Sequence, residues 1–254
     1  MRVKRVTSVD IDSTYCCAST IPPEWAKLLH ESREWFKANL GKHVEGYHLL
    51  DDRKAVGQIY YAASENAIIP YEVEPNVACI YCTEMLKGYM HKGYGKMMFD
   101  YAKADLKARG SKGMMVAATE IKEFMHYELF LKQGFKTIQE RSPFKIMYFP
   151  LNQERIRVRI LPLNYSPSKD KVEVTLFRNF FCAVSPYMYR LIKTVAQSFG
   201  DKVKLVEIEA TPQTVRKYGT EGPLINGKIK LFGPASEEQV RKSIQEEIDK
   251  FGQV

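Results

Sequence analysis

The sequence lacks long apolar runs and a recognisable leader. No stretch approaches the about 20 consecutive apolar residues that a membrane-spanning helix requires. The first six residues, Met1 to Val6, are basic but have no apolar core of the kind found in signal peptides. These absences predict a cytoplasmic protein with no membrane partner.

Cysteine is scarce and odd in number. The chain has 5 cysteines in 254 residues, which argues against a disulfide framework. Cys79 and Cys82 have the spacing of a metal or redox pair, but no second Cys or His pair follows at zinc spacing. Both lie within an expected strand, where residues three apart point to opposite faces. We therefore predict two core thiols and no metal.

Dense runs of Lys and Arg are absent, and so is a basic stripe interleaved with aromatic residues. These absences argue against a nucleic-acid partner. The net charge is nevertheless +8. Such a surplus indicates either an anionic ligand or a solvated basic surface.

The most informative segment runs from Val77 to Arg109. Its pattern predicts a strand over 77–85, a short turn, and a helix that ends at Arg109. Gly93 and Gly95 lie at the turn, where glycine lets the backbone approach a ligand without a Cβ in the way. The first amides of a helix have no internal partners, and the helix dipole adds positive charge there. Phosphate is the expected guest of this turn.

This segment lacks the longer glycine motifs of nucleotide-binding proteins. The P-loop spacing is missing, and Met98 stands where a dinucleotide fingerprint has its third glycine. Lys92 and Lys96 flank the turn and add mobile positive charge. A short Gly-x-Gly is compatible both with a phosphate site and with a plain helix-starting turn.

Two segments carry a family resemblance. The first is Met90-His91-Lys92-Gly93-Tyr94-Gly95, which resembles motif A of the GCN5-related N-acetyltransferases (GNAT), Gln/Arg-x-x-Gly-x-Gly/Ala, except for Met90. The second runs from Tyr127 to Phe135 and resembles the motif B helix with its closing Gly-Phe. The resemblance implies acetyl-CoA as co-substrate. It places the cofactor-binding residues at Thr83, Met85, His91, Lys92, Gly93, Tyr94, Gly95 and Lys96.

In that family the backbone amides at the end of the central strand hold pantetheine and polarise the thioester oxygen, as an oxyanion hole does. Glu84 at this strand end is our candidate for the general base. Tyr81 and His91 are weaker alternatives, and a surface pairing of Glu84 with Lys87 is the competing interpretation.

The general acid departs from the family pattern. Phe130 occupies the position where the family usually has a tyrosine, and it has no proton to give. Tyr127 lies one helical turn earlier, and residues three apart share a helix face. Tyr127 is therefore the candidate acid, with side-chain packing as its other interpretation and water as a substitute donor.

The composition changes after residue 150. We predict an acetyltransferase domain over 1–150, a bridging strand and linker over 151–170, and a smaller domain over 171–254. The last part resembles a thioredoxin-like domain, with Cys182-x-x-Ser185 at its redox motif and Gly222-Pro223 at its cis-proline. A helix-start thiol would have a lowered pKa, although Ser185 cannot resolve a disulfide.

The predicted fold class is α+β (α/β), a GNAT acyl-CoA N-acyltransferase fold with a mixed central sheet, followed by the thioredoxin-like domain. The Cys16-Cys17 pair and the tail make the chain similar to the YoaP-type acetyltransferases. Hydrophobic periodicity and turn residues predict strands over 2–9, 43–50, 54–63, 113–119, 135–141, 145–149, 171–177 and 202–208, helices within 22–41, 124–133, 182–199 and 211–219, a hairpin about Asn226-Gly227, and a helix from Ser236.

Three functions follow from these expectations. The first is direct transfer of an acetyl group from acetyl-CoA to an amine. The second is a catalytically weak acyl-CoA-binding or sensing protein with a thioredoxin-like interaction domain. The third is a thiol-dependent protein that works through Cys182.

Overall fold

The computed structural model describes residues 1–122 and 124–251. The chain forms two compact units, and each is described by itself. Unit 1 consists of Met1–Thr20, Phe36–Ala67 and Glu72–Arg159. Unit 2 consists of Ile21–Trp35, Ile68–Tyr71 and Ile160–Val254, so that two short segments from the first half of the chain belong to it.

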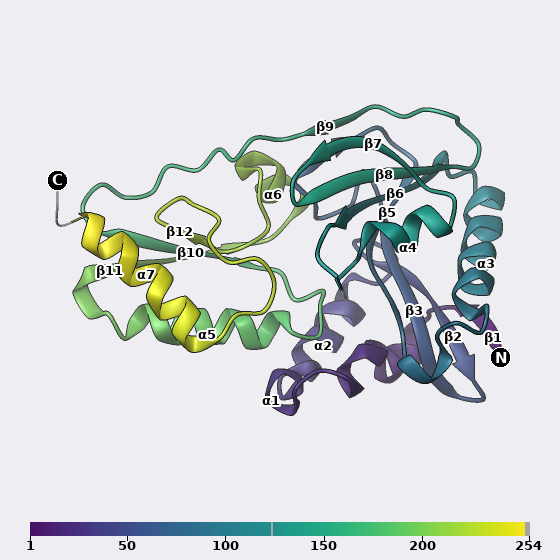
Figure 1. The fold of residues 1–254 in the computed structure, drawn as a ribbon, viewed down its shortest axis with the longest axis horizontal. Helices are drawn as coiled ribbons and strands as arrows, with labels where there is room; N and C mark the ends of the chain where they lie inside the picture. Colours follow the sequence, from purple (N-terminus) through teal and green to yellow (C-terminus); the bar gives the residue numbers. More distant parts are fainter. Residues whose placement is uncertain (123, 252–254) are drawn as a thin grey trace. The chain divides into compact units, whose positions relative to one another are not determined.

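Unit 1 is built on a seven-stranded sheet in the order β1-β2-β3-β5-β6-β8-β7 (Figure 1). Its strands are β1 Arg2–Arg5, β2 Glu45–Asp51, β3 Lys54–Ala63, β5 Val77–Met85, β6 Gly113–Thr119, β7 Lys136–Arg141 and β8 Phe144–Pro150. Neighbouring strands are antiparallel except for β5 and β6, which are parallel. The predicted mixed sheet and α+β composition are therefore confirmed.

Helix α3 (Tyr94–Ala108) packs on one face of this sheet. Its apolar stripe of Met98, Phe99, Ala102 and Leu106 is buried against the sheet, as the periodicity predicts. Each large side chain buried in this way contributes roughly 1.5–3 kcal/mol. The shorter helix α4 (Tyr127–Lys132) adds Phe130 to the same core.

The opposite face carries aromatic and polar groups. Phe36 is fully buried against Tyr60, with ring centroids 4.9 Å apart, and Tyr15 packs on both. The Tyr15 amide donates to the Tyr60 hydroxyl at 3.0 Å, and that hydroxyl lies 3.0 Å from Nε2 of the fully buried His48. A short 3-10 turn, η2 (Cys16–Ser19), contacts β3 and β5.

Three predicted elements have different bounds in the structure. The first strand stops at Arg5 because Thr7 and Asp10 form a capping box that opens the 3-10 helix η1 (Ser8–Ser13). The helix predicted within 22–41 is divided into α1 (Pro23–Ala26) and α2 (Leu29–Asn39). The helix predicted from residue 124 begins at Tyr127.

The connection between β3 and β5, residues 64–76, contains a strand. β4 (Tyr71–Val73) pairs with β9 (Val158–Ile160) in a two-stranded sheet. β9 lies within the bridging strand and linker predicted over 151–170. A partner from outside the main sheet therefore keeps residues 71–73 extended.

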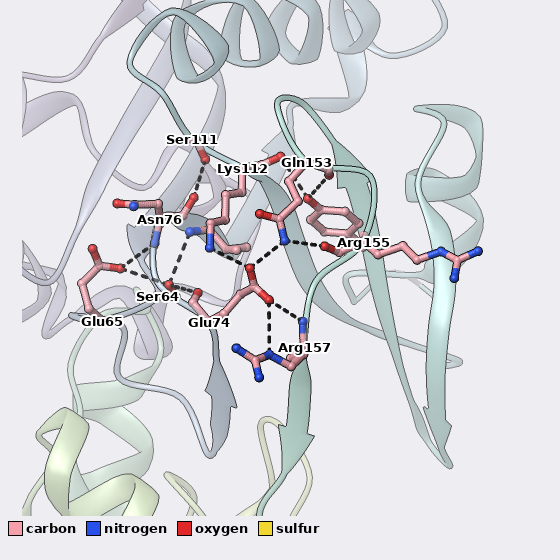
Figure 2. A network of polar contacts seen from close by, with 11 residues as sticks. Ser64, Glu65, Glu74, Asn76, Ser111, Lys112, Gln153, Arg155 and Arg157 are labelled. Atoms are coloured by element: carbon pink, nitrogen blue, oxygen red, sulfur yellow. Dashed lines mark hydrogen bonds and ion pairs between the residues drawn. The ribbon is translucent and has the colours of Figure 1, made fainter.

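Glu74 fastens the end of this loop to the segment after β8 (Figure 2). Its carboxylate accepts hydrogen bonds from Lys112 Nζ and Gln153 Nε2, both at 2.7 Å, and from the Arg157 amide at 2.8 Å. These hydrogen bonds lower the pKa of Glu74 from its ordinary 4.5 to about 2, and the bond from Lys112 contributes most to the shift. The backbone of residues 153–157 is thus tied to unit 1 by a carboxylate that is fully supplied with donors.

Unit 2 is built on a three-stranded sheet in the order β11-β10-β12. Its strands are β10 Val172–Arg178, β11 Val203–Glu209 and β12 Leu224–Ile225, and its helices are α5 Ser185–Gln197, α6 Pro212–Tyr218 and α7 Glu237–Phe251. Figure 1 shows α5 and α7 side by side along this sheet. The predicted hairpin is reduced to a single bridge between Ile225 and Lys228, and the Gly222–Pro223 bond is not cis.

One of the apolar clusters of unit 2 is completed by residues from the first half of the chain. Ile68 is buried with Phe177, Val215 and Leu224, and Trp35 packs against them. Trp35 also meets the ring of Phe181, with centroids 6.5 Å apart. Deleting the segments 21–35 and 68–71 would therefore expose this cluster.

His48 makes stability depend on pH. Burial lowers the pKa of His48 from its ordinary 6.5 to about 4, so protons bind the unfolded chain more readily than the folded one. The stability contributed by neutral His48 is present above pH 6.5 and is lost as the pH falls toward 4. We expect a loss of about 2 kcal/mol between pH 7 and pH 5 from this group.

Urea unfolding of the parent and of His48→Gln at both pH values measures this contribution. The variant should lose less stability on acidification than the parent, while His30→Gln, at an exposed histidine, should leave the pH dependence unchanged. A parent and a His48→Gln variant with equal acid slopes would contradict the assignment.

Candidate active site

The parallel strands β5 and β6 are paired over their first residues and then separate. Their pairing runs from Val77↔Gly113 to Ile80↔Val116. Beyond these residues β5 continues to Met85 and β6 continues to Thr119 with no further pairing between the described residues. Beyond the pairing, the backbone of each strand has other partners: the Thr83 amide donates to the Met125 sulfur at 3.3 Å, and the Thr119 amide donates to the Met125 carbonyl at 2.9 Å.

A β-bulge in β5 lies at the point where the strands part. β3 pairs Tyr61 with Ile80 but Tyr60 with Cys82, so Tyr81 is an extra residue. Cys79 pairs with Ala62 and Cys82 with Tyr60, which places both thiols on one face of the sheet. The prediction of opposite faces was wrong, because it assumed a regular alternation that the bulge interrupts.

The bulge also decides where Glu84 points. Glu84 pairs with Gln58 and shares its face, while Thr83 and Met85 share the face of the α3 core. Gln58 Oε1 accepts the Cys16 amide at 2.8 Å, and its Nε2 lies 3.6 Å from Cys82 Sγ. Glu84 therefore shares the face that η2 contacts with the Cys16 and Cys82 thiols and the Gln58 side-chain amide.

The electrostatics of this face favour neutral forms. Burial raises the pKa of Glu84, although its Oε1 accepts the Met85 amide at 3.0 Å. Burial also raises the pKa of the Cys16 thiol to about 12, and the charge of Glu84 adds to that shift. A carboxylate with a raised pKa is a stronger proton acceptor than an exposed one.

Thr83 and Met85 occupy the other side of the strand. The Thr83 amide donates to the sulfur of Met125 at 3.3 Å. The Met85 side chain packs over Gly57, where an added Cβ would lie 2.9 Å from Met85 Cε. The sequence contains no signal for the Met125 contact, because the two residues are 42 positions apart.

The glycine turn before α3 is exposed. Gly93 is the N-cap residue of α3 with φ 79°, and no side chain caps the helix there. His91 also has a left-handed backbone, with φ 60°. A Cβ built on Gly93 or Gly95 would meet nothing within 4 Å. The turn is therefore not crowded by side chains at these two glycines.

Positive charge surrounds this turn. His91, Lys92 and Lys96 are exposed, and Lys96 forms an ion pair with Asp100 one turn along the helix. The Lys92 ammonium lies 5.9 Å from the ring centroid of Tyr89. The half-buried Tyr94 packs against the core and anchors the start of the helix.

Tyr127 and Phe130 differ in their surroundings. Phe130 is fully buried among Phe99 and Phe135, so its position has a packing role. Tyr127 is half-buried, its ring centroid lies 4.7 Å from that of His126, and Lys145 Nζ lies 4.9 Å from its centroid. These contacts orient the phenol but do not join it to Glu84.

Cys182 in unit 2 is half-buried. The amides of Ala183, Val184 and Ser185 hydrogen-bond to its thiol, but burial outweighs them and raises the pKa of the thiol. The lowered pKa predicted from the helix start was therefore wrong, because desolvation of the thiolate costs more than the amides return.

Over residues 1–122 and 124–251, no group of three or more His, Cys, Asp or Glu side chains is arranged to hold a metal ion. In the same part of the chain, no helix combines the length and apolarity that crossing a bilayer requires.

No protein-family model and no curated protein matches the chain. Its fold is similar to solved structures of N-acetyltransferases. PaiA N-acetyltransferase from Thermoplasma acidophilum, in complex with coenzyme A, is 15% identical, with 59% of this chain and 99% of that chain covered and a TM-score of 0.41. The GNAT domain of S. lividans PAT is 12% identical, with 59% and 90% covered and a TM-score of 0.46. The GNAT family N-acetyltransferase YhbS from Escherichia coli, in complex with CoA, is 13% identical, with 59% and 81% covered and a TM-score of 0.43.

Gly95→Leu tests whether a ligand approaches the turn. Because a Cβ there meets nothing within 4 Å and leucine favours helix over glycine, the free energy of unfolding should stay constant or rise by about 0.5–1 kcal/mol. Acetyl-CoA affinity, measured by calorimetry, should fall at least tenfold. The control Gly88→Leu, at a second glycine with open space, should bind as the parent does. Equal affinity in all three proteins would argue against the turn as a ligand site.

Proposed function

We propose that the chain is an acetyl-CoA-dependent N-acetyltransferase with a GNAT acyltransferase fold over residues 1–150. The observation that supports this most is the parting of β5 and β6 beside an exposed helix start. The first feature places the Thr83 amide against a weak acceptor, the Met125 sulfur, which an extended ligand could replace. The second starts a helix with no side-chain cap, where a phosphate could bind. Acetyl-CoA needs both.

The donor would bind through its two chemical halves. The amides of Tyr94, Gly95 and Lys96 would take the pyrophosphate, because the first amides of a helix have no intrahelical acceptor. Lys92 and Lys96 would supply positive charge. The pantetheine arm would then lie along β5, with the thioester near the amides of Thr83 and Met85.

Glu84 would act as the general base in direct transfer. It would take a proton from the attacking ammonium or amine, whose nitrogen lone pair forms the new C–N bond at the thioester carbonyl. The C–S bond then breaks, and the departing thiolate receives a proton from Tyr127 or from water. The amide of Thr83 would stabilise the negative charge that develops on the carbonyl oxygen.

A second candidate function is acyl-CoA binding or sensing with weak turnover. Two residues favour it. Phe130 is fully buried where the family usually has its acid, and Met90 stands exposed where motif A has a polar residue. Such a protein would keep the donor site and lose the proton path.

For the rest of the chain we propose a linker over 151–170 and a thioredoxin-like interaction domain over 171–254. The raised pKa of the half-buried Cys182 favours a structural part over thiolate chemistry. The carbonyl of Cys182 accepts a hydrogen bond from Ser32 Oγ at 2.9 Å, which fixes the backbone at this point.

Thermal unfolding with and without acetyl-CoA tests the proposed function. A ligand that binds only the folded chain at 100 times its Kd adds about 2.7 kcal/mol, which for this length corresponds to a Tm rise of about 5–10 °C. ATP at the same concentration controls for general attraction of phosphate to a basic surface. A Tm unchanged by acetyl-CoA, or raised equally by ATP, would count against the proposal.

Glu84→Gln separates the enzyme from the sensor. If Glu84 is the base, the variant should bind acetyl-CoA as the parent does while kcat for thiol release with an amine panel falls about 100-fold or more. Parental kcat should fall as the pH drops through the raised pKa of Glu84, since only the carboxylate accepts a proton. Glu128→Gln, at an exposed carboxyl on α4, should retain the parental kcat. Equal kcat in Glu84→Gln and the parent would remove Glu84 from the mechanism.

A further inference from the structure

Met125 bridges the two inner strand edges where β5 and β6 part. Its carbonyl accepts the Thr119 amide at 2.9 Å, and the next residue, His126, forms a parallel bridge with Thr119. β8 pairs with the other edge of β6, so this bond uses the edge that faces β5. The backbone of Met125 is thus attached to β6.

The side chain of Met125 reaches β5. The Thr83 amide donates to its sulfur at 3.3 Å. β3 pairs with the other edge of β5, so this amide belongs to the edge that faces β6. One residue therefore spans the place where the strands separate, with its carbonyl on one strand and its thioether on the other.

The conformation of Met125 is unusual for its residue type. Its φ is 47°, in the left-handed region that costs a non-glycine residue free energy. The buried Thr119 holds the preceding backbone, because its hydroxyl donates to the carbonyls of Phe124 and, at 3.2 Å, Ile121. A strained backbone persists only where its surroundings determine it, and here they aim the thioether at Thr83.

We propose that Met125 is a donor-site residue whose thioether competes with the thioester arm of acyl-CoA for the Thr83 amide. This inference rests on the proposed function. A thioether sulfur is a weak hydrogen-bond acceptor, whereas a carbonyl oxygen is a strong one. The sulfur keeps the Thr83 donor satisfied, and the carbonyl of the arm replaces it at a small cost. The three rotatable bonds of methionine let the sulfur withdraw without moving the backbone.

If the sulfur competes with the pantetheine arm, removing the sulfur should tighten the binding of ligands that carry the arm and should not affect ligands that lack it. Met125→Leu keeps the volume but removes the acceptor, and Met125→Ala removes both. Acetyl-CoA should bind each variant about two- to tenfold more tightly than the parent, the change expected from one neutral hydrogen bond. Binding of 3′-phospho-ADP, which lacks the pantetheine arm, should not change.

The test is calorimetric titration of four full-length proteins with acetyl-CoA and with 3′-phospho-ADP. The proteins are the parent, Met125→Leu, Met125→Ala and the control Leu129→Ala at an exposed residue. Thermal unfolding without ligand verifies that each variant is folded. The proposal is supported if both Met125 variants bind acetyl-CoA more tightly than the parent and Leu129→Ala does not. It is also supported if the two Met125 variants bind measurably while the parent binds too weakly to measure. Parental acetyl-CoA binding with unchanged variants, or equal tightening of 3′-phospho-ADP, overturns the proposal and leaves the proposed function standing. Acetyl-CoA binding by no protein in the set overturns both.

Discussion

The single extra residue at Tyr81 is the constraint on which the candidate site depends. Without it, β5 would alternate regularly, and Glu84 would point into the core that α3 covers. With it, Glu84 shares a face with Gln58, while Thr83 and Met85 turn toward the core side. A bulge costs a strand part of its hydrogen-bond ladder. Here it coincides with the end of pairing to β6, so the ladder is interrupted on both edges of β5 within a few residues.

Backbone amides in unit 1 are satisfied in two different ways. Where a segment is held for its architecture, the acceptor is a strong one, such as the Glu74 carboxylate on the Arg157 amide. At the candidate site the Thr83 amide has a thioether, and the helix start at Gly93 has no side-chain cap. Weakly satisfied donors are inexpensive to transfer to a ligand. The proposed donor site consists of such weakly satisfied donors, at the turn before α3 and on β5.

Unit 2 illustrates how burial overrides local electrostatics. The thiol of Cys182 has three amides around it at the start of α5, an arrangement that normally stabilises a thiolate. Desolvation nevertheless raises its pKa. The cluster of Ile68, Trp35 and Phe177 shows the same dependence on tertiary context, because its members come from segments far apart in the chain.

The sequence alone determined those features that depend on neighbouring residues. Periodicity and turn residues located β5, β6 and the long core helix α3, and they placed the start of α7 at Ser236, where the structure shows reciprocal hydrogen bonds between Ser236 and Gln239. The turn at Gly93 before this helix was likewise predicted from the residue type. Tertiary structure decided the bulge at Tyr81, the face of Glu84 and the reach of Met125 to Thr83, since each depends on strand register between segments distant in sequence. It also decided the protonation tendencies of His48, Glu84 and Cys182, because burial is a property of the packed chain and no local pattern encodes it.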